Sequence, residues 1–358
     1  MARLKVLALL TDGFGARGGI ARYNCDLISA LAQSRGIEHI TILPRFGDKG
    51  APVPPRVTQL TPRTNRLAWS CKALQLTLSH SYDLVFCGHL FAAPLAAGLS
   101  HLMRIPLWLQ LHGIESWQRP VCVVRWAASQ ARLTTAVSRA TRERALKWCQ
   151  SEPERMRVLP NTIDSQFSPE PASEALRRRF GTTGRKVILT VSRLAALERY
   201  KGHDKIIAAL PLIRARCPQV LYLIAGEGDD RQRLETLAQQ SGVAQLVRFT
   251  GPISPQELAG IYGLADIFAM PSTGEGFGIV FLEAAASGLP IVAGNLDGSV
   301  DALADGALGT LIDPNDRLVL ADAIVAGLGR GRQGKSLAQR FAYANFAAQV
   351  DHLVTSRF

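Results

Sequence analysis

Cysteine-based structural sites are absent from this 358-residue sequence. Its six cysteines, at positions 25, 71, 87, 122, 149 and 217, include no CxxC pair and have no histidine at metal-ligand spacing. This usage is typical of a reduced, cytoplasmic protein and excludes a structural zinc site of the usual kind. We therefore expect no metal.

A secretory leader and a transmembrane segment are not evident either. The opening, "MARLKVLALLTDG", is a short charged start that leads into a strand and a loop. The most apolar long stretch, residues 90–111, contains His101, Arg104 and two prolines. It predicts helix, turn and strand rather than a membrane span.

No block of lysine and arginine resembles a nucleic-acid-binding arm, although the formal net charge is +12. A basic balance favours anionic partners, among them nucleic acid, an acidic membrane surface and phosphorylated substrates. Because the arginines are spread along the chain, we favour phosphates and a lipid surface and expect no nucleic-acid partner.

Short apolar strands alternate with amphipathic helices, which predicts parallel α/β sheets covered on both faces. The chain is long enough for two cores, and the alternation restarts at "KVILTVSR" after a weakly patterned linker at 161–174. We predict two Rossmann-like, doubly wound domains, residues 1–162 and 163–340, facing a central cleft that holds the ligand. A helix at 341–358 is expected to pack back across the domain junction. The proline-rich segment 44–80 contains a helical stretch but is otherwise unassigned.

The first strand is followed by a GxGxxG loop (13–18), the spacing of a dinucleotide site. The predicted second strand, however, ends in Pro44 and Arg45, where a nicotinamide-binding unit would place a carboxylate for the ribose. Gly18 and Gly19, just before a helix, are the stronger pair, because their amides can approach an anion closely. A turn that needs positive φ angles is the structural alternative, and Arg45 leaves NADP open.

The most informative stretch is "MPSTGEGFGIVFLEAAASGLPIVAG" (270–294). Glu275 lies in a loop among three glycines, and Glu283 lies one turn inside a helix predicted to run from Ile279 to Ser287. The free N–H groups at the start of this helix suit a diphosphate. The helical rise would separate the two carboxylates by about 8 Å, and each would accept hydrogen bonds from sugar or ribose hydroxyls. The expected donor-binding residues here are Glu275, Gly276, Phe277, Gly278, Ile279, Val280 and Glu283.

Two cations, Arg193 and Lys201, follow the first strand of the second half in "SRLAALERYKGHD" (192–204). Opposite a helix N-terminus they would neutralise a diphosphate and stabilise it as a leaving group. The structural alternative is two exposed charges on a loop. The adjacent acids Asp229 and Asp230 are interpreted as residues that open a helix rather than as metal ligands.

With these motifs the sequence resembles the GT-B glycosyltransferases, in particular the retaining glycosyltransferase family four. The family's E-x7-E motif matches Glu275 and Glu283, and the resemblance covers the whole chain and is best in its second half. It implies transfer of a sugar from a nucleotide diphosphate sugar to a hydroxyl acceptor, with retention of configuration and without a metal or cofactor. It implies that Arg193 and Lys201 bind the phosphates of the donor. The segment between these two residues contains an extra "ALERY" and is longer than in many members of the family.

The resemblance also implies roles for residues of the first domain, which would bind the acceptor, and for one further segment of the second. It places His112, directly after the predicted strand 106–111, near the donor sugar, and the main chain from Gly251 to Ile253 near the nucleotide base. Gly18 and Gly19 join the donor site. The catalytic set is Glu275, His112, Arg193 and Lys201. The candidates on the acceptor side are Asp12, His89 and Glu115.

A glycan or lipid-linked acceptor of cell-envelope polysaccharide biosynthesis fits best. Basic segments with tryptophan, at 61–80 and 117–132, favour peripheral association with the inner face of an anionic membrane. Core-facing tryptophans with a solvated basic face are the alternative. A GT-B sugar-nucleotide epimerase, a non-catalytic nucleotide-sugar-binding protein and an NADP-dependent oxidoreductase also remain open, as does the choice among UDP, GDP and ADP sugars.

Overall fold

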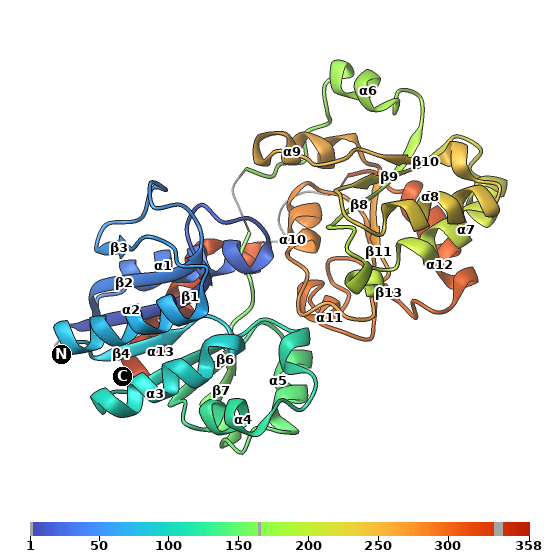
Figure 1. The fold of residues 1–358 in the computed structure, drawn as a ribbon. Coiled ribbons are helices and arrows are strands. Elements are labelled where there is room, and N and C mark those ends of the chain that lie inside the picture. Colours follow the sequence, from blue (N-terminus) through green and yellow to red (C-terminus); the bar gives the residue numbers. More distant parts are fainter. Residues whose placement is uncertain (1–2, 164–165, 333–338) are drawn as a thin grey trace. The chain divides into compact units, whose positions relative to one another are not determined.

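The protein, described by a computed structural model over residues 3–163, 166–332 and 339–358, consists of two α/β units (Figure 1). The first unit comprises Met1–Thr162 and Ala342–Phe358, and the second comprises Ile163–Phe341. Each has its own sheet and its own hydrophobic core. Among the described residues, no helix combines the length and the hydrophobicity needed to cross a bilayer.

The first unit contains a seven-stranded sheet in the order β3-β2-β1-β4-β5-β6-β7, with every pairing parallel. Its strands are β1 (Leu4–Asp12), β2 (Ile37–Phe46), β3 (Val57–Gln59), β4 (Leu84–Cys87), β5 (Leu107–Leu111), β6 (Leu133–Ala136) and β7 (Met156–Val158). Its α-helices are α1 (Gly19–Gln33), α2 (Arg66–Ser79), α3 (Ala93–Met103), α4 (Cys122–Ser129), α5 (Arg139–Leu146) and α13 (Tyr343–Arg357). Short 3-10 turns occur at η1 (Leu90–Ala92), η2 (Ile114–Ser116) and η3 (Pro153–Arg155).

Helices cover both faces of this sheet, because alternate residues of each apolar strand point to opposite sides. Leu7 and Leu9 belong to the core cluster that also contains buried residues of α2, α3 and α4. Helices α1 and α13 pack on each other, and Tyr23 of α1 meets Phe346 of α13 edge to face, 5.9 Å between ring centroids. The last helix of the chain thus belongs to the unit that holds the first strand (Figure 1).

The second unit contains a six-stranded parallel sheet in the order β10-β9-β8-β11-β12-β13. Its strands are β8 (Lys186–Val191), β9 (Val220–Ala225), β10 (Val247–Phe249), β11 (Ile267–Met270), β12 (Ile291–Gly294) and β13 (Thr310–Ile312). Its helices are α6 (Glu174–Phe180), α7 (His203–Arg216), α8 (Arg231–Gln240), α9 (Pro255–Leu264), α10 (Ile279–Ala286), α11 (Ser299–Ala302) and α12 (Arg317–Leu328), with 3-10 turns η4 (Ala196–Lys201) and η5 (Ala244–Leu246).

Both sheets have the strand order of a doubly wound fold, which confirms the predicted fold class. In such sheets the order reverses at one point, between β1 and β4 in the first unit and between β8 and β11 in the second. In folds of this kind, ligands bind outside the carboxyl ends of the two strands at this point. The predicted site residues Asp12, Arg193 and Glu275 lie at or just beyond the carboxyl ends of these strands.

The described part of the predicted linker is attached to the second unit. Phe167 is buried and meets Tyr262 edge to face, 5.4 Å between centroids. The Ala172 N–H donates to the Gly263 carbonyl at 2.9 Å. The chain enters and leaves the second unit side by side, since the Ile163 N–H donates to the Phe341 carbonyl at 3.0 Å. The stretch is therefore part of a packed unit rather than a free tether.

Replacing Phe346 by Ala tests the contribution of α13 to the first unit. Loss of a buried aromatic ring should lower the free energy of unfolding of that unit by about 3–5 kcal/mol. All five tryptophans lie in the first unit, so urea unfolding followed by tryptophan fluorescence reports on it alone. The control is Gln349→Ala on the exposed side of α13, expected to change the value by no more than about 0.5 kcal/mol. Equal values for the two variants would contradict the packing described here.

Candidate functional site

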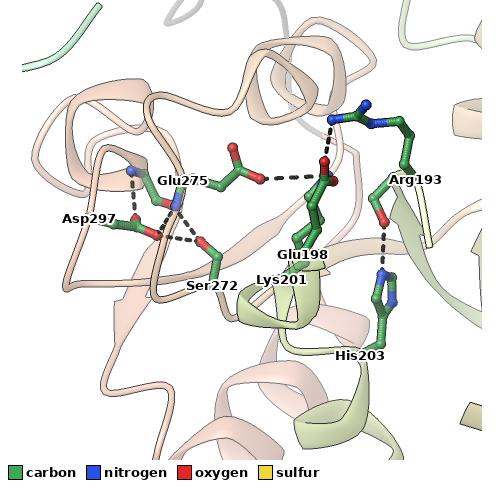
Figure 2. A network of polar contacts seen from close by, with 9 residues as sticks. Arg193, Glu198, Lys201, His203, Ser272, Glu275 and Asp297 are labelled. Carbon is green, nitrogen blue, oxygen red and sulfur yellow. Dashed lines mark hydrogen bonds and ion pairs between the residues drawn. The ribbon is translucent and has the colours of Figure 1, made fainter. Parts of the chain in front are cut away.

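Three of the predicted site residues come together at the carboxyl ends of β8 and β11 in the second unit (Figure 2). Arg193 follows β8, Lys201 ends η4 just before α7, and Glu275 lies in the loop between β11 and α10. Lys201 Nζ is 3.9 Å from Glu275 Oε1, and both side chains are mostly buried, at 12% and 15% exposure. The Arg193 side chain is 77% exposed.

Glu198, from the "ALERY" segment, connects the two cations. One of its carboxylate oxygens pairs with Lys201 Nζ at 2.8 Å, and the other pairs with the Arg193 guanidinium. The side chain of Glu198 is only 13% exposed. The departure in length noted in the sequence therefore adds a carboxylate at the centre of the site (Figure 2).

Asp297, three residues beyond β12, fixes the loop that carries Glu275. Its buried carboxylate accepts hydrogen bonds from the Glu275 N–H at 2.7 Å, the Ser272 hydroxyl at 2.7 Å and the Ser299 N–H at 2.9 Å. A buried carboxylate is tolerated only when donors compensate for its lost hydration. Ser272 and Glu275 belong to the loop between β11 and α10, and Ser299 is the first residue of α11. Asp297 therefore holds this loop and the start of α11 together.

Burial raises the pKa of Glu275 to about 7, with Asp297 and Glu198 adding to the increase and Lys201 opposing it. At neutral pH the carboxyl is therefore divided between its acid and its carboxylate form. It can donate a hydrogen bond to a hydroxyl or accept one from it.

Helix α10 begins beside Glu275 with its amide groups unblocked by any side-chain cap. Its N-cap residue is Gly278, whose φ of 84° is unfavourable for other residues. The first-turn N–H groups of a helix lack partners within the helix and favour an anion. Ile279 and Val280, at this end, are partly exposed, whereas the Phe277 side chain is buried against Phe341, so Phe277 offers its main chain only.

Glu283 lies on α10, and the Tyr262 hydroxyl donates a hydrogen bond to its Oε2 at 2.7 Å. This contact orients a half-buried carboxylate. Gly251 lies after β10 with a φ of 75° and pairs with Gly226, and Ile253 follows it as a partly exposed residue before α9.

The acidic pair before α8 is engaged by protein groups. Asp229 accepts a hydrogen bond from the Ala196 N–H at 2.8 Å, and Asp230 pairs with Arg199 and Arg233 at 3.0 and 2.6 Å. Both residues thus anchor η4, the segment that carries Glu198. Among the residues that the structure describes, no group of three or more His, Cys, Asp or Glu could hold a metal ion.

In the first unit, His112 follows β5, His89 follows β4 and Asp12 ends β1. The His89 and His112 rings stack with centroids 5.9 Å apart, and Glu115 Oε1 accepts a hydrogen bond from the His112 N–H at 2.6 Å. The first unit therefore gathers the proposed sugar and acceptor residues at one edge of its sheet. Their contacts with donor and acceptor stay predictions.

The ionisation and tautomer of His112 follow from its surroundings. Burial lowers the pKa of His112 to about 4, against the opposing effect of Glu115, so the ring is neutral at pH 7. Its Nε2 lies 2.8 Å from the Gly88 carbonyl oxygen, which can only accept. Nε2 therefore carries the proton, and Nδ1 is left as an acceptor for a hydroxyl.

The glycine loop divides into two parts. At its start, the side chain of Gln59 accepts from the Phe14 N–H at 2.8 Å and donates to the Phe14 carbonyl at 3.0 Å, which packs the first part of the loop against β3. Gly18, with a φ of 109°, and Gly19 are exposed at the start of α1. Arg45, the residue that left NADP open, donates to the Thr64 carbonyl at 2.5 Å.

Sequence reasoning missed Glu198 and Asp297. The signal for Glu198 was the lengthened segment between Arg193 and Lys201, which was noted only for its length. The signal for Asp297 was an acid at the carboxyl end of an apolar strand, the edge at which ligands bind in this fold.

The raised pKa of Glu275 predicts a pH-dependent stability of the second unit. Its folded-state pKa, about 7, exceeds the ordinary value of 4.5, so its contribution is fully present below 4.5 and is lost as the pH rises through 7. Glu275→Gln removes the titration. In calorimetric unfolding, the second unit of the wild type should lose stability relative to this variant between pH 4.5 and pH 7. The transition of the second unit is recognised because it leaves the tryptophan fluorescence unchanged. A constant difference across that range would contradict the raised pKa.

Comparison with known proteins gives matches over both units. Residues 17–167 match the family model "Glycosyltransferase Family 4", and residues 173–341 match "Glycosyl transferases group 1". A GDP-mannose-dependent alpha-(1-6)-phosphatidylinositol monomannoside mannosyltransferase of Mycobacterium tuberculosis is 32% identical over 345 residues, 89% of this chain and 88% of that protein. The protein of the same description from Mycolicibacterium smegmatis is 34% identical over 265 residues, covering 70% of this chain and 67% of that one.

Solved structures agree in fold. The Anabaena protein HepE in complex with UDP and glucose superposes with a TM-score of 0.76 at 23% identity, over 99% of this chain and 100% of that chain. The lipopolysaccharide outer core galactosyltransferase WaaB gives 0.75 at 16% identity, again over 99% and 100%. Together with the relatives above, these matches establish that the chain belongs to glycosyltransferase family 4 and has the GT-B fold.

Proposed function

We propose that this glycosyltransferase moves a hexose from a nucleotide diphosphate sugar to a hydroxyl of a glycan or lipid-linked acceptor, with retention of configuration and without a metal ion. The observation that carries the proposal is the pairing of Lys201 with Glu275 in the loop before α10, with Arg193 joined to Lys201 through Glu198. Cations and helix amides suit a diphosphate, and a carboxyl that both donates and accepts suits sugar hydroxyls.

GDP-mannose is the donor to test first. The relatives that match most of their length to this chain are named GDP-mannose-dependent mannosyltransferases. HepE, which shares the fold at 23% identity, was solved with UDP-glucose, so UDP sugars belong in the same screen. In the proposed complex, Glu283 holds the ribose, and the main chain from Gly251 to Ile253 frames the base.

The reaction breaks the bond between the anomeric carbon and the diphosphate oxygen. Negative charge builds up on the departing diphosphate, where Arg193, Lys201 and the α10 amides stabilise it. The acceptor hydroxyl attacks from the face that the diphosphate leaves and passes its proton to a diphosphate oxygen, which gives retention without a covalent intermediate. Glu275 holds the sugar, so that positioning and charge stabilisation supply the rate enhancement.

The first unit is proposed to contribute the acceptor side. In this proposal, Nδ1 of the neutral His112 ring accepts a hydrogen bond from a sugar hydroxyl. The amides of Gly18 and Gly19 donate to the diphosphate. Asp12, His89 and Glu115 surround His112 and offer acceptors for the hydroxyl that attacks, since each of the three lies near enough to affect its titration.

A membrane-bound acceptor agrees with the surface of α2 and α4. Trp69 of the first predicted segment is a core residue, but Leu67 and Leu78 on α2 are 78% and 73% exposed. On α4, Val123 and Trp126 are 49% and 47% exposed. Exposed apolar side chains among arginines are typical of surfaces that bind anionic lipid, and the named relatives act on a phosphatidylinositol mannoside.

Lys201→Ala and Glu275→Ala should each lower sugar transfer and donor hydrolysis by about a hundredfold or more, because each removes a group that binds the reacting part of the donor. A thermal-shift panel of UDP, GDP, ADP and their sugars first selects the donor, and product formation is then followed by NMR, which also reports the anomeric configuration. Lys205→Ala, which removes a partly exposed lysine that contacts Asn315, is the matched control.

Wild-type rates in both site variants would defeat the assignment. Conversion of the donor alone into an epimerised nucleotide sugar would favour an epimerase, and nucleotide binding without turnover on any acceptor would favour a binding protein.

Flotation with phosphatidylcholine vesicles should retain the protein only when phosphatidylglycerol is included, and less so as salt increases, because the attraction is partly electrostatic. Replacing Val123 and Trp126 by Ser should weaken retention about tenfold. Leu318→Ser, which removes an apolar side chain that is 62% exposed on α12, is the control. Retention independent of lipid charge, or an equal loss in the control, would argue against this surface.

A further inference from the structure

Glu198 occupies the two cations that the proposed reaction needs for the diphosphate. Among the described residues, it is the carboxylate that pairs with both Arg193 and Lys201. Its two carboxylate oxygens face different cations, one Arg193 and the other Lys201 (Figure 2). Nothing in the E-x7-E motif requires a third carboxylate at this position.

The backbone around Glu198 is held firmly. The Ala196 N–H donates to Asp229 at 2.8 Å, the Arg199 guanidinium pairs with Asp230 at 3.0 Å, and the Thr273 N–H donates to the Tyr200 carbonyl at 2.9 Å. Glu198 itself interrupts the 3-10 turn with a φ of −112° and a ψ of 25°. Its carboxylate is therefore delivered to the cations by a fixed turn rather than by a loosely placed surface side chain.

We propose that Glu198 is an internal competitor of the diphosphate, which neutralises Arg193 and Lys201 in the free enzyme and weakens the binding of both donor and nucleoside diphosphate product. This inference rests on the proposed function only in taking these cations as the diphosphate site. The competition is for the same positive charges, and a bound diphosphate would also be repelled by the Glu198 carboxylate.

The exchange needs only side-chain movement. Arg193, at 77% exposure, can rotate from Glu198 to a phosphate without rearranging the buried core, whereas Lys201 is enclosed and must share its ammonium between carboxylate and phosphate. Because Glu198 opposes the bound diphosphate before and after transfer, it costs donor affinity but speeds release of the nucleoside diphosphate. Release of product, rather than the chemical step, limits the turnover of many enzymes.

Glu198→Gln tests the proposal, because it keeps the shape of the side chain and removes its charge. Isothermal titration with GDP, UDP and inorganic pyrophosphate should give dissociation constants about tenfold lower than wild type for pyrophosphate and for the nucleotide that the enzyme prefers, a change of about 1.4 kcal/mol. Product inhibition by that nucleotide should strengthen by the same factor. Glu235→Gln on α8, which removes an equal charge from a surface pair with Arg231, should leave these constants unchanged.

Two further variants guard against an indirect effect. Glu198→Asp keeps the charge but shortens its reach, so its dissociation constants should fall between those of wild type and Glu198→Gln. Combining Glu198→Gln with Lys201→Ala should abolish most of the gain, since the competition is for that ammonium.

Unchanged or weaker pyrophosphate and nucleotide binding in both Glu198 variants would overturn the proposal while leaving the glycosyltransferase site in place. Tighter pyrophosphate binding without binding of any nucleotide would support the competition and contradict the proposed donor site. Absence of binding by every probe to wild type and variants would overturn both.

Discussion

The contact of Lys201 with Glu198 and Glu275 organises the second unit's site. A parallel sheet buries apolar strands on both faces, so its polar groups collect in the loops at the carboxyl ends. Charges that meet there are partly withdrawn from water and must compensate one another. Lys201 supplies the compensation for two acids, and Asp297 meets its own requirement with backbone and hydroxyl donors. The ion pairs of Lys201 and the hydrogen bonds of Asp297 together fix the loops that carry Glu198 and Glu275.

The same electrostatics links the site's protonation to its geometry. The pKa of Glu275 rises to about 7 because the carboxyl is buried near Asp297 and Glu198, and because the opposing charges of Lys201 and Arg193 do not offset these three effects. In the first unit the cause is again burial, but the group is a base, so the pKa of His112 falls and its ring is neutral. Burial at the sheet edges therefore shifts both residue types toward their uncharged forms.

The sequence was sufficient where the signal is local. Apolar runs and glycine stops predicted most strands and the helix α10, and the spacing of Glu275 and Glu283 predicted a family that the comparisons confirm. The three-residue strands β3 and β13 were not predicted, although β7 and β10, which are equally short, lie in apolar runs that indicated a strand. β3 also lies in a proline-rich segment and is defined mainly by its pairing with β2.

The site was less accessible to sequence reasoning because its decisive contacts are not local. Glu275 and Asp297 are 22 residues apart, and this spacing does not predict that the Glu275 backbone N–H donates to the Asp297 carboxylate. Glu198 is close in sequence to both cations, yet its role depends on a turn fixed by Asp229 and Asp230 from another loop. Tertiary placement, rather than residue type, turned these acids into parts of the site.

The protein is basic, yet the charges at this site nearly cancel one another. The net charge of +12 attracts anions of every kind, but Glu198 and the ionised fraction of Glu275 offset Arg193 and Lys201 where a diphosphate would bind. A small anion meets little free positive charge there. In the proposed complex, a nucleotide sugar adds contacts through its base, ribose and sugar, which offset the loss of the Glu198 pairing. If these cations are the diphosphate site, as proposed, local neutrality makes binding depend on the whole ligand rather than on its charge alone.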